Sequence, residues 1–487
     1  MDPSKIALFV VVAVIIVAGI ALAKDLRKYF LVLMILFAPM SSGLIFYHYN
    51  GAMLMDFPML ALLLMAFAAP EKKFRWSFPI IGIPALAFVG WSLATCFAAS
   101  NSGWAFSEFT RILRGYLLCV CVANYVNSPA RLKVALNALL ATFAFQALLG
   151  TYQWRYGPLG LTILEEVGYD WRSSGTFIHP GVFGDYLIVL LPLVLRLFAF
   201  HRNSSRQMWL AYLMMFVFGM CALLGSYGRG PWVSFAGAVV LTLIYSLPQK
   251  RLRPKAKAPI MIMIVLGIAF GIHYAPTITE QFTDDHRKSS ADVRAPLNRV
   301  AWRMFNDHAI MGVGLGNYRL VSIPYARKEM GSTPNVNWRE YAQIVHNSFM
   351  LVLTETGALG LLLLLLLILS AFRVGLKSLK IKNAFLNNLS LGLLAGLLGL
   401  CISVNTGPNL MNHQILMMFW LVIGFLIAIK HFKISSPVAS KKTATPSPEE
   451  ASSHTPVNNE NAIVSESRAF AQEPIARPQQ WGNRNSH

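Results

Sequence analysis

The sequence is short of charged residues, and of acidic ones in particular. It has 42 Lys and Arg but only 22 Asp and Glu in 487 residues, so charged residues make up 13% of the chain. Soluble domains are usually about a quarter charged, and this shortage excludes an ordinary soluble globular protein. With 55% hydrophobic residues and a mean hydropathy of +0.51, the chain is expected to be an integral membrane protein.

Cysteine is also scarce. The five cysteines lie inside apolar stretches, which excludes a disulfide framework and predicts small core residues instead. We expect no metal and no cofactor. The net charge of +20 does not indicate a nucleic-acid partner, because the basic residues fall in short clusters between apolar runs, as topology signals do.

Apolar runs long enough to cross about 30 Å of hydrocarbon as a helix recur along most of the chain. Because lipid cannot hydrogen-bond the backbone, these runs predict helices rather than open sheets. The fold class is therefore an all-α polytopic membrane protein with about 12–13 transmembrane helices. A cleaved signal peptide is the alternative for the first run. The expected spans are 6–23, 29–47, 51–69, 78–99, 112–127, 134–154, 182–200, 208–225, 231–247, 259–275, 347–372, 386–404 and 414–430.

Connecting segments alternate between basic, such as "EKKFRW" and "QKRLRPKAK", and free of Lys and Arg, such as "YHYNG" and "NTGPNLMNH". Basic loops remain in the cytoplasm, so the other set faces outward. Two outward segments are long: the loop 155–180, and a lid at 276–346 between the tenth and eleventh spans. The predicted domains are a transmembrane bundle at 1–275, the periplasmic lid at 276–346, transmembrane helices at 347–433 and a disordered cytoplasmic tail at 434–487, which is rich in Ser, Pro, Thr and Asn.

Arginines on the outward side break the charge rule and need another explanation. Arg229 lies in the short turn "GSYGRGPWVSF" among three glycines. An arginine near membrane depth is costly unless it is paired or binds an anion, and glycines permit a close backbone approach. The structural alternative is a guanidinium that reaches carbonyls or headgroups.

Three further arginines are assigned outside: Arg172 before a span, and Arg299 and Arg303, which are four residues apart and share one helical face. Solvated lid residues are the alternative for the last two. Together with Arg229, they supply planar bidentate donors that suit a phosphate or pyrophosphate.

His346 ends the lid at the start of an apolar run, where an imidazole can accept a proton from a sugar hydroxyl. Asn347 beside it is a predicted helix N-cap. Glu355 lies nine residues further on, about 13 Å deeper and on the opposite helical face. We therefore expect it to pack against a neighbouring helix, aided by Gly357 and Gly360, and not to pair with His346.

Four segments in order resemble motifs of the bacterial O-antigen ligase and polymerase superfamily. They are "RSSGTFIHPGVFGDYL", "GSYGRGPWVSF", "NRVAWRMFNDHAIMGVGLGNY" and "HNSFMLVLTETGALGLLLLL", covering about Arg172 to Gly360. The resemblance implies a metal-independent, inverting glycosyltransferase of the GT-C type in the bacterial inner membrane. Its donor would be an undecaprenyl-pyrophosphate-linked glycan, and its active site would be periplasmic.

Carried onto this chain, the resemblance implies that Arg229 and Arg299 bind the donor pyrophosphate, with Arg172 and Arg303 as further candidates. His346 would deprotonate the acceptor hydroxyl, with Asn347, Tyr227 and Glu355 in support. No Asp-x-Asp pair indicates a nucleotide-sugar site, as expected for a lipid-linked donor. The family usually has about twelve spans, so one N-terminal helix here would be an addition.

The remaining hypotheses differ mainly in the acceptor of the glycan. The leading hypothesis is an O-antigen ligase that transfers the glycan to lipid A core. The alternatives are a polysaccharide polymerase that joins lipid-linked repeats and a protein O-oligosaccharyltransferase. A transporter of lipid-linked glycan belongs to another class and is disfavoured, because we find no internal repeat and the unusual charges gather on one side.

Overall fold

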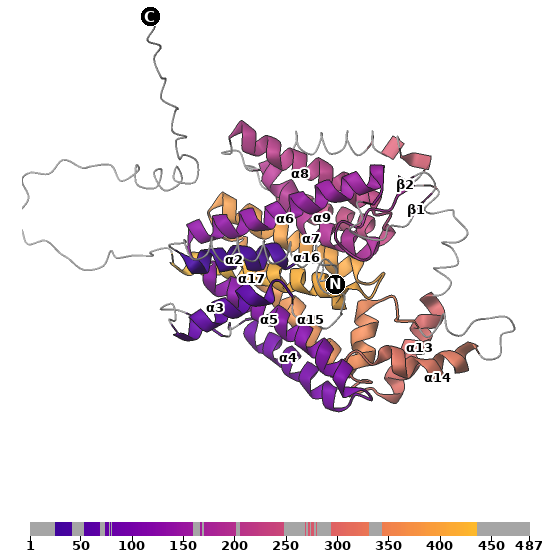
Figure 1. Ribbon diagram of the computed structural model, residues 1–487. Helices are drawn as coiled ribbons and strands as arrows, with labels where there is room; N and C mark the ends of the chain where they lie inside the picture. Colours follow the sequence, from indigo (N-terminus) through magenta and orange to yellow (C-terminus); the bar gives the residue numbers. More distant parts are fainter. Residues whose placement is uncertain are drawn as a thin grey trace, which may run out of the picture.

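The computed structural model describes residues 25–40, 53–68, 74–76, 78, 80–158, 166–167, 170–200, 205–247, 294–330 and 343–435, with isolated positions between 268 and 279. These residues are mostly helical (Figure 1). The predicted span 6–23, nearly all of the predicted span 259–275 and the tail beyond residue 435 lie outside the described residues.

Each remaining predicted span overlaps one helix, although residues 41–47 of the predicted span 29–47 lie outside the described residues. This confirms the all-α polytopic fold class. Among the described helices, α6, α7, α8, α15, α16 and α17 are long and apolar enough to cross a membrane. The bounds are α2 Leu26–Phe37, α3 Asp56–Ala68, α4 Gly82–Phe97, α5 Ser102–Tyr125, α6 Pro129–Tyr156, α7 Pro180–Phe200, α8 Arg206–Gly225, α9 Arg229–Ser246, α13 Arg294–Asp307, α14 Tyr318–Met330, α15 Ser348–Ser378, α16 Ala384–Ser403 and α17 His413–Ser435.

Polar caps set the starts of several helices. Asn101 caps α5, Ser128 caps α6 ahead of Pro129, and Asn383 caps α16; each side chain accepts a hydrogen bond from a backbone N–H of the first turn. These caps satisfy donors that lipid or protein interior would leave without a partner. The apolar runs therefore begin and end as helices at defined residues.

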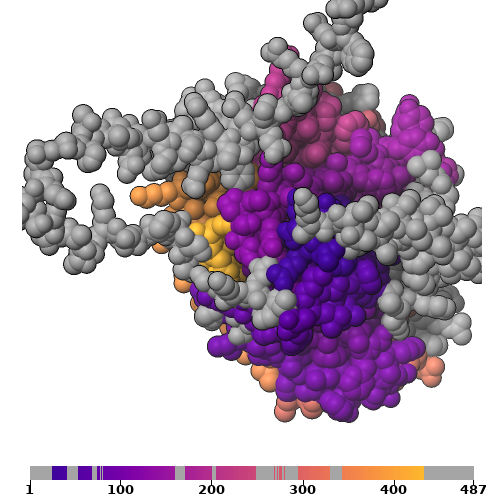
Figure 2. Space-filling model, turned by 60° about the vertical axis from the view of Figure 1, so that its left-hand side comes forward, coloured from indigo at the N-terminus to yellow at the C-terminus, as the bar shows by residue number. Residues whose placement is uncertain are grey.

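The centre of the bundle is formed by α7 and α17. In their apolar windows 94% and 83% of the residues are buried inside the protein, and Figure 2 shows α17 only as a yellow edge beside the indigo and violet helices. Helix α16 packs closely on α7 because Gly392 and Gly396, four residues apart, lie against the backbone of Leu193 and Val189. Such close helix contact through small residues is typical of membrane bundles.

The two ends of the bundle differ in chemistry. Helices α8 and α9 meet in a short turn at one end, where the backbone N–H of Ser173 donates to the carbonyl of Gly225 (2.8 Å) and that of Ser348 donates to the carbonyl of Val404 (2.8 Å). We call this the outer end. The basic segments that contain Arg131 and Lys377 adjoin the opposite helix ends, as the charge pattern predicted.

The lid segment contributes α13 and α14 at the outer end (Figure 1). These helices enclose a small core of their own, which includes Val300, Met304 and Tyr318 and extends to Val345 and Leu351 at the start of α15. In the outer loop 155–180, Glu166–Val167 (β1) and Asp170–Trp171 (β2) form a two-residue antiparallel pair. The lid core thus includes the residue directly before His346.

Backbone hydrogen bonds dock the lid onto α15. The N–H groups of Val313 and Gly314 donate to the carbonyls of Thr354 (2.9 Å) and Glu355 (3.0 Å). Helix α15 breaks at Gly357, which has φ 73° and ψ −176°. A Cβ at Gly357 would lie 2.0 Å from the carbonyl oxygen of Ile310, so only glycine permits this approach.

Candidate functional site

The turn between α8 and α9 presents Arg229 at the outer end. Gly225 ends α8 and Arg229 begins α9. Between them, Tyr227 adopts a left-handed φ of 52°, and the Ser226 hydroxyl donates to the carbonyl of Leu223 (2.6 Å) and accepts from the N–H of Gly228 (3.3 Å). Arg229 therefore stands in the first turn of a helix, where both the guanidinium and the helix dipole favour an anion.

The glycines of this turn serve protein packing. A Cβ at Gly225 would lie 2.6 Å from the Trp154 ring, and one at Gly230 would lie 2.2 Å from the Thr406 hydroxyl oxygen. The close approaches expected from the glycines are therefore made by side chains of this chain. Thr406 lies in the loop between α16 and α17, so this loop contacts the start of α9 directly.

Arg172 lies beside the same turn. Its Nε and Nη2 atoms both donate to the carbonyl of Ser226 at 3.4 Å, and the hydroxyl of the next residue, Ser173, donates to the carbonyl of Ala222 (3.0 Å). Arg172 and Arg229 thus approach one turn from two different elements. The structure brings these two predicted residues together.

Arg294, the first residue of α13, joins them and was missed by the sequence reasoning. It is half-buried and lies close enough to Arg229 and His346 for their charges to interact. Burial, and then the charge of Arg229, lowers the pKa of Arg294. Within the described residues its buried Nε has no hydrogen-bond partner. A cation held near a second cation, with a donor unsatisfied, is suited to an anionic ligand.

His346 stands directly before the helix that carries it, α15, and is half-buried. Burial, and then the positive charge of Arg294, lowers its pKa, while a hydrogen bond to the backbone of Ile344 acts in the opposite direction. The neutral imidazole is therefore favoured at neutral pH, and its buried Nδ1 has no partner among the described residues. The neutral imidazole is the form that can accept a proton, as a general base must.

Asn347 caps α15, as predicted. Its Oδ1 accepts from the N–H groups of Phe349 (2.9 Å) and Met350 (3.1 Å). This fixes the backbone beside His346. Tyr227 is buried, and its hydroxyl accepts from Trp154 Nε1 at 3.3 Å, so it braces the Arg229 turn from within.

The structure places Arg299 and Arg303 on one face of α13, as their spacing predicted, and both reach Glu329 of α14. The Nε of Arg299 lies 2.5 Å and the Nη1 of Arg303 lies 2.7 Å from the carboxylate oxygens of Glu329. The arginine side chains are 56% and 46% exposed, so these ion pairs hold the lid helices together at the surface. A role in binding pyrophosphate stays a prediction for both.

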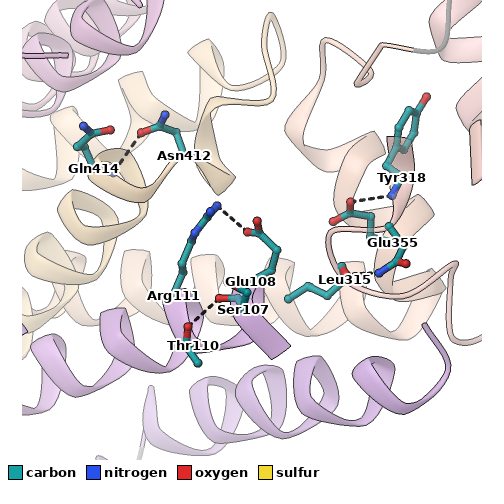
Figure 3. Close-up of polar contacts among 10 residues, drawn as sticks. Ser107, Glu108, Thr110, Arg111, Leu315, Tyr318, Glu355, Asn412 and Gln414 are labelled. Carbon is teal, nitrogen blue, oxygen red and sulfur yellow. Dashed lines mark hydrogen bonds and ion pairs between the residues drawn. The ribbon is translucent and has the colours of Figure 1, made fainter. Parts of the chain in front are cut away.

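Glu355 contacts the lid. Its Oε1 accepts from the backbone N–H of Tyr318 at 3.3 Å, and Glu108 and Arg111 of α5 lie close enough to act on it electrostatically. Figure 3 shows the ion pair between Arg111 and Glu108 (2.8 Å) on one side and the hydrogen bond between Glu355 and Tyr318 on the other. Glu355 therefore lies where α5, the lid and α15 meet.

The site gathers three arginines and one neutral histidine at the outer end. Among the described residues, no group of three or more His, Cys, Asp or Glu side chains is arranged to hold a metal ion. No curated protein matches the chain. Residues 214–365, which carry Arg229, Arg294 and His346, match the family model described as O-antigen ligase. This match includes three of the four segments that resemble the O-antigen ligase and polymerase superfamily, and it supports that resemblance.

Proposed function

We propose that this protein transfers a glycan from undecaprenyl pyrophosphate to a hydroxyl of an acceptor sugar, and that it acts as an O-antigen ligase whose acceptor is lipid A core. The observation that supports this most is the meeting of Arg229, Arg294 and His346, which come from three separate helices or helix ends. The matched family model is described as O-antigen ligase, which supports glycan transfer as the reaction.

The residues divide into a donor side and a base. Arg229 and Arg294, with Arg172 beside them, bind the pyrophosphate and offset the charge that grows on it as the bond from the anomeric carbon to the phosphate oxygen breaks. His346 accepts the proton of the attacking hydroxyl as the new bond from the anomeric carbon to oxygen forms. Attack opposite the leaving pyrophosphate inverts the anomeric carbon. These steps use only groups of the chain and need no metal.

The proposed location is the bacterial inner membrane, with the site on the periplasmic face. The supporting feature is that the site lies at the outer end, while basic segments such as the one containing Lys377 and Lys380 adjoin the opposite helix ends. A lipid-linked donor would reach the arginines from the outer leaflet, with membrane lipids around the bundle.

The test is the surface glycan of a deletion strain that carries either the wild-type chain or His346→Ala. We expect the variant to insert normally and to leave lipid A core without long glycan, while polymerised glycan remains on the donor lipid. His308→Ala is the matched control, because His308 is an exposed histidine of the same lid. Full ligation by His346→Ala would refute the base, and single repeats in place of polymer would indicate a polymerase.

A further inference from the structure

Asp185 is a buried carboxylate that the proposed chemistry does not use. It lies in the second turn of α7 and its exposed fraction is 0%. Both of its oxygens accept hydrogen bonds, one from the hydroxyl of Ser403 and the other from Nδ2 of Asn409 (2.7 Å). A buried carboxylate is costly unless its hydrogen bonds are satisfied, so the position of this one requires an explanation.

The two donors lie at the two ends of one loop, residues 403–409. Ser403 is the last residue of α16, and Asn409 begins the short 3-10 helix η3, Asn409–Met411, ahead of α17. Because a carboxylate only accepts, Asp185 fixes the direction of both bonds, whereas an amide or hydroxyl at this position would allow either direction. Asp185 therefore holds the segment 403–409 in one conformation against α7.

The same loop is held from its other side by the start of α15. The hydroxyl of Ser348 donates to the carbonyl of Gly407 (2.8 Å) and accepts from the N–H of Leu410 (3.1 Å). Its own N–H donates to the carbonyl of Val404 (2.8 Å). Ser348 is two residues from His346, so the loop fixes the backbone that carries the imidazole.

The loop also touches the donor side of the site. Thr406 lies against Gly230, the residue after Arg229, and its backbone N–H and hydroxyl both donate to the carbonyl of Ser403 (2.8 Å each). One short segment thus contacts the first turn of α9 and the start of α15. Its position relative to α7 sets the spacing between the anion-binding turn and the base.

We infer that Asp185 is a positioning residue for the transfer reaction, acting through Asn409 and Ser348 on His346. This inference rests on the proposed function, in which His346 is the base. Asp185 itself does not contact the donor or the acceptor. A shift of about 1 Å in a reacting group can cost about 10²-fold in rate, and this is the loss we expect when the loop is released.

The experiment exchanges the carboxylate of residue 185 and the amide of residue 409. Glycan transfer is measured with the full-length protein in lipid nanodiscs. In Asp185→Asn the amide nitrogen must face either Asn409, where two donors would meet, or Ser403, whose hydroxyl would have to change from donor to acceptor. We expect kcat to fall about 10²-fold with little change in KM. Asn409→Asp places two carboxylates side by side and should also be impaired. The double variant Asp185→Asn/Asn409→Asp restores both bonds, because residue 185 now donates to residue 409 and still accepts from Ser403, and we expect it to recover wild-type kcat.

A second measurement needs no turnover. Diethyl pyrocarbonate modifies neutral imidazole, and mass spectrometry of the His346 peptide reports its rate across pH. We expect faster modification in Asp185→Asn and the wild-type rate in the exchanged pair. Ser246→Ala is the matched control, because it removes a buried hydrogen bond of 2.6 Å to Arg196 near the far end of α7; it should change neither the pH profile nor the reactivity of His346.

The outcomes separate the two hypotheses. Wild-type kcat in Asp185→Asn, or an exchanged pair no better than its single variants, would overturn the positioning role. If Asp185→Asn does not accumulate, the exchanged pair alone decides, since its recovery supports the role and its inactivity overturns it. If His346→Ala stays active, the proposed function fails, while the reactivity of His346 still reports whether Asp185 positions it.

Discussion

Replacing Arg294 with glutamine should slow glycan transfer and also alter its dependence on pH. The Nε of Arg294 is buried, and the side chain is close enough to Arg229 and to His346 for their charges to interact. Loss of one preorganised donor to developing charge costs about 10²–10³-fold in kcat, or roughly 2.7–4 kcal/mol. We expect a loss of this size for Arg294→Gln at the pH optimum.

The pH effect has a definite sign. In the proposed reaction His346 acts as a base in its neutral form, and its pKa is lowered from 6.5, first by burial and then by the positive charge of Arg294. Removing that charge raises the pKa, so more of the imidazole is protonated at a given pH. The acid limb of the kcat profile should therefore move to higher pH in Arg294→Gln. In Arg294→Lys the charge remains, so the limb should stay in place while the bidentate contact is lost.

The assay is transfer of a synthetic undecaprenyl-pyrophosphate glycan to purified acceptor, measured in nanodiscs over a pH series. Arg319→Gln, an exposed arginine of the same lid, is the control and should resemble wild type. Arg299→Gln tests the competing assignment, because its exposed guanidinium is bound to Glu329. A large loss in Arg299→Gln together with wild-type kcat and an unmoved acid limb in Arg294→Gln would refute our reasoning.

Three other variants test the turn, the carboxylate and the break in α15. Arg229→Lys keeps the charge but loses planar bidentate donation, and transfer should fall by at least about tenfold; wild-type turnover would favour a structural guanidinium. Glu355→Ala leaves the buried N–H of Tyr318 unsatisfied at about 1–3 kcal/mol, and limited proteolysis should detect a looser lid, whereas Glu355→Gln keeps an acceptor and should remain resistant. Gly357→Ala forces a side chain into a glycine-only conformation that costs about 1–3 kcal/mol, and its thermal unfolding temperature should drop. Gly90→Ala, where nothing lies within 4 Å of the added Cβ, should not change it.

Much of the architecture could be predicted from the sequence. Hydrocarbon thickness sets the length of a span and lipid forbids unsatisfied backbone, so apolar runs alone predict helices with useful accuracy. The runs 134–154 and 182–200, for example, fall within α6 and α7. The helix cap at Asn347 could also be predicted, because it depends only on local sequence: its side chain accepts hydrogen bonds from first-turn N–H groups of the helix that it precedes.

The candidate site could be predicted only in part from the sequence. The sequence indicated Arg229, Arg172 and His346 because they are polar residues at the ends of apolar runs, and such positions can be read from the sequence alone. Arg294 gave no such signal, since it lies in a polar lid segment among other arginines. Arg299 fitted the family motif better, yet its neighbour in space is Glu329. Which lid arginine lies near His346 depends on how α13 packs against the bundle, and no local sequence signal reports that packing.

The sequence by itself thus determined the membrane class, the helices and the charge difference between the two ends, because these depend on hydropathy, charge and local capping. The tertiary structure decided which groups meet. The electrostatic interaction of Arg294 with His346 and the hydrogen bond between Asp185 and Asn409 join residues far apart in the chain. Such interactions arise from helix packing and loop docking, whose many weak and non-local terms no short stretch of sequence contains.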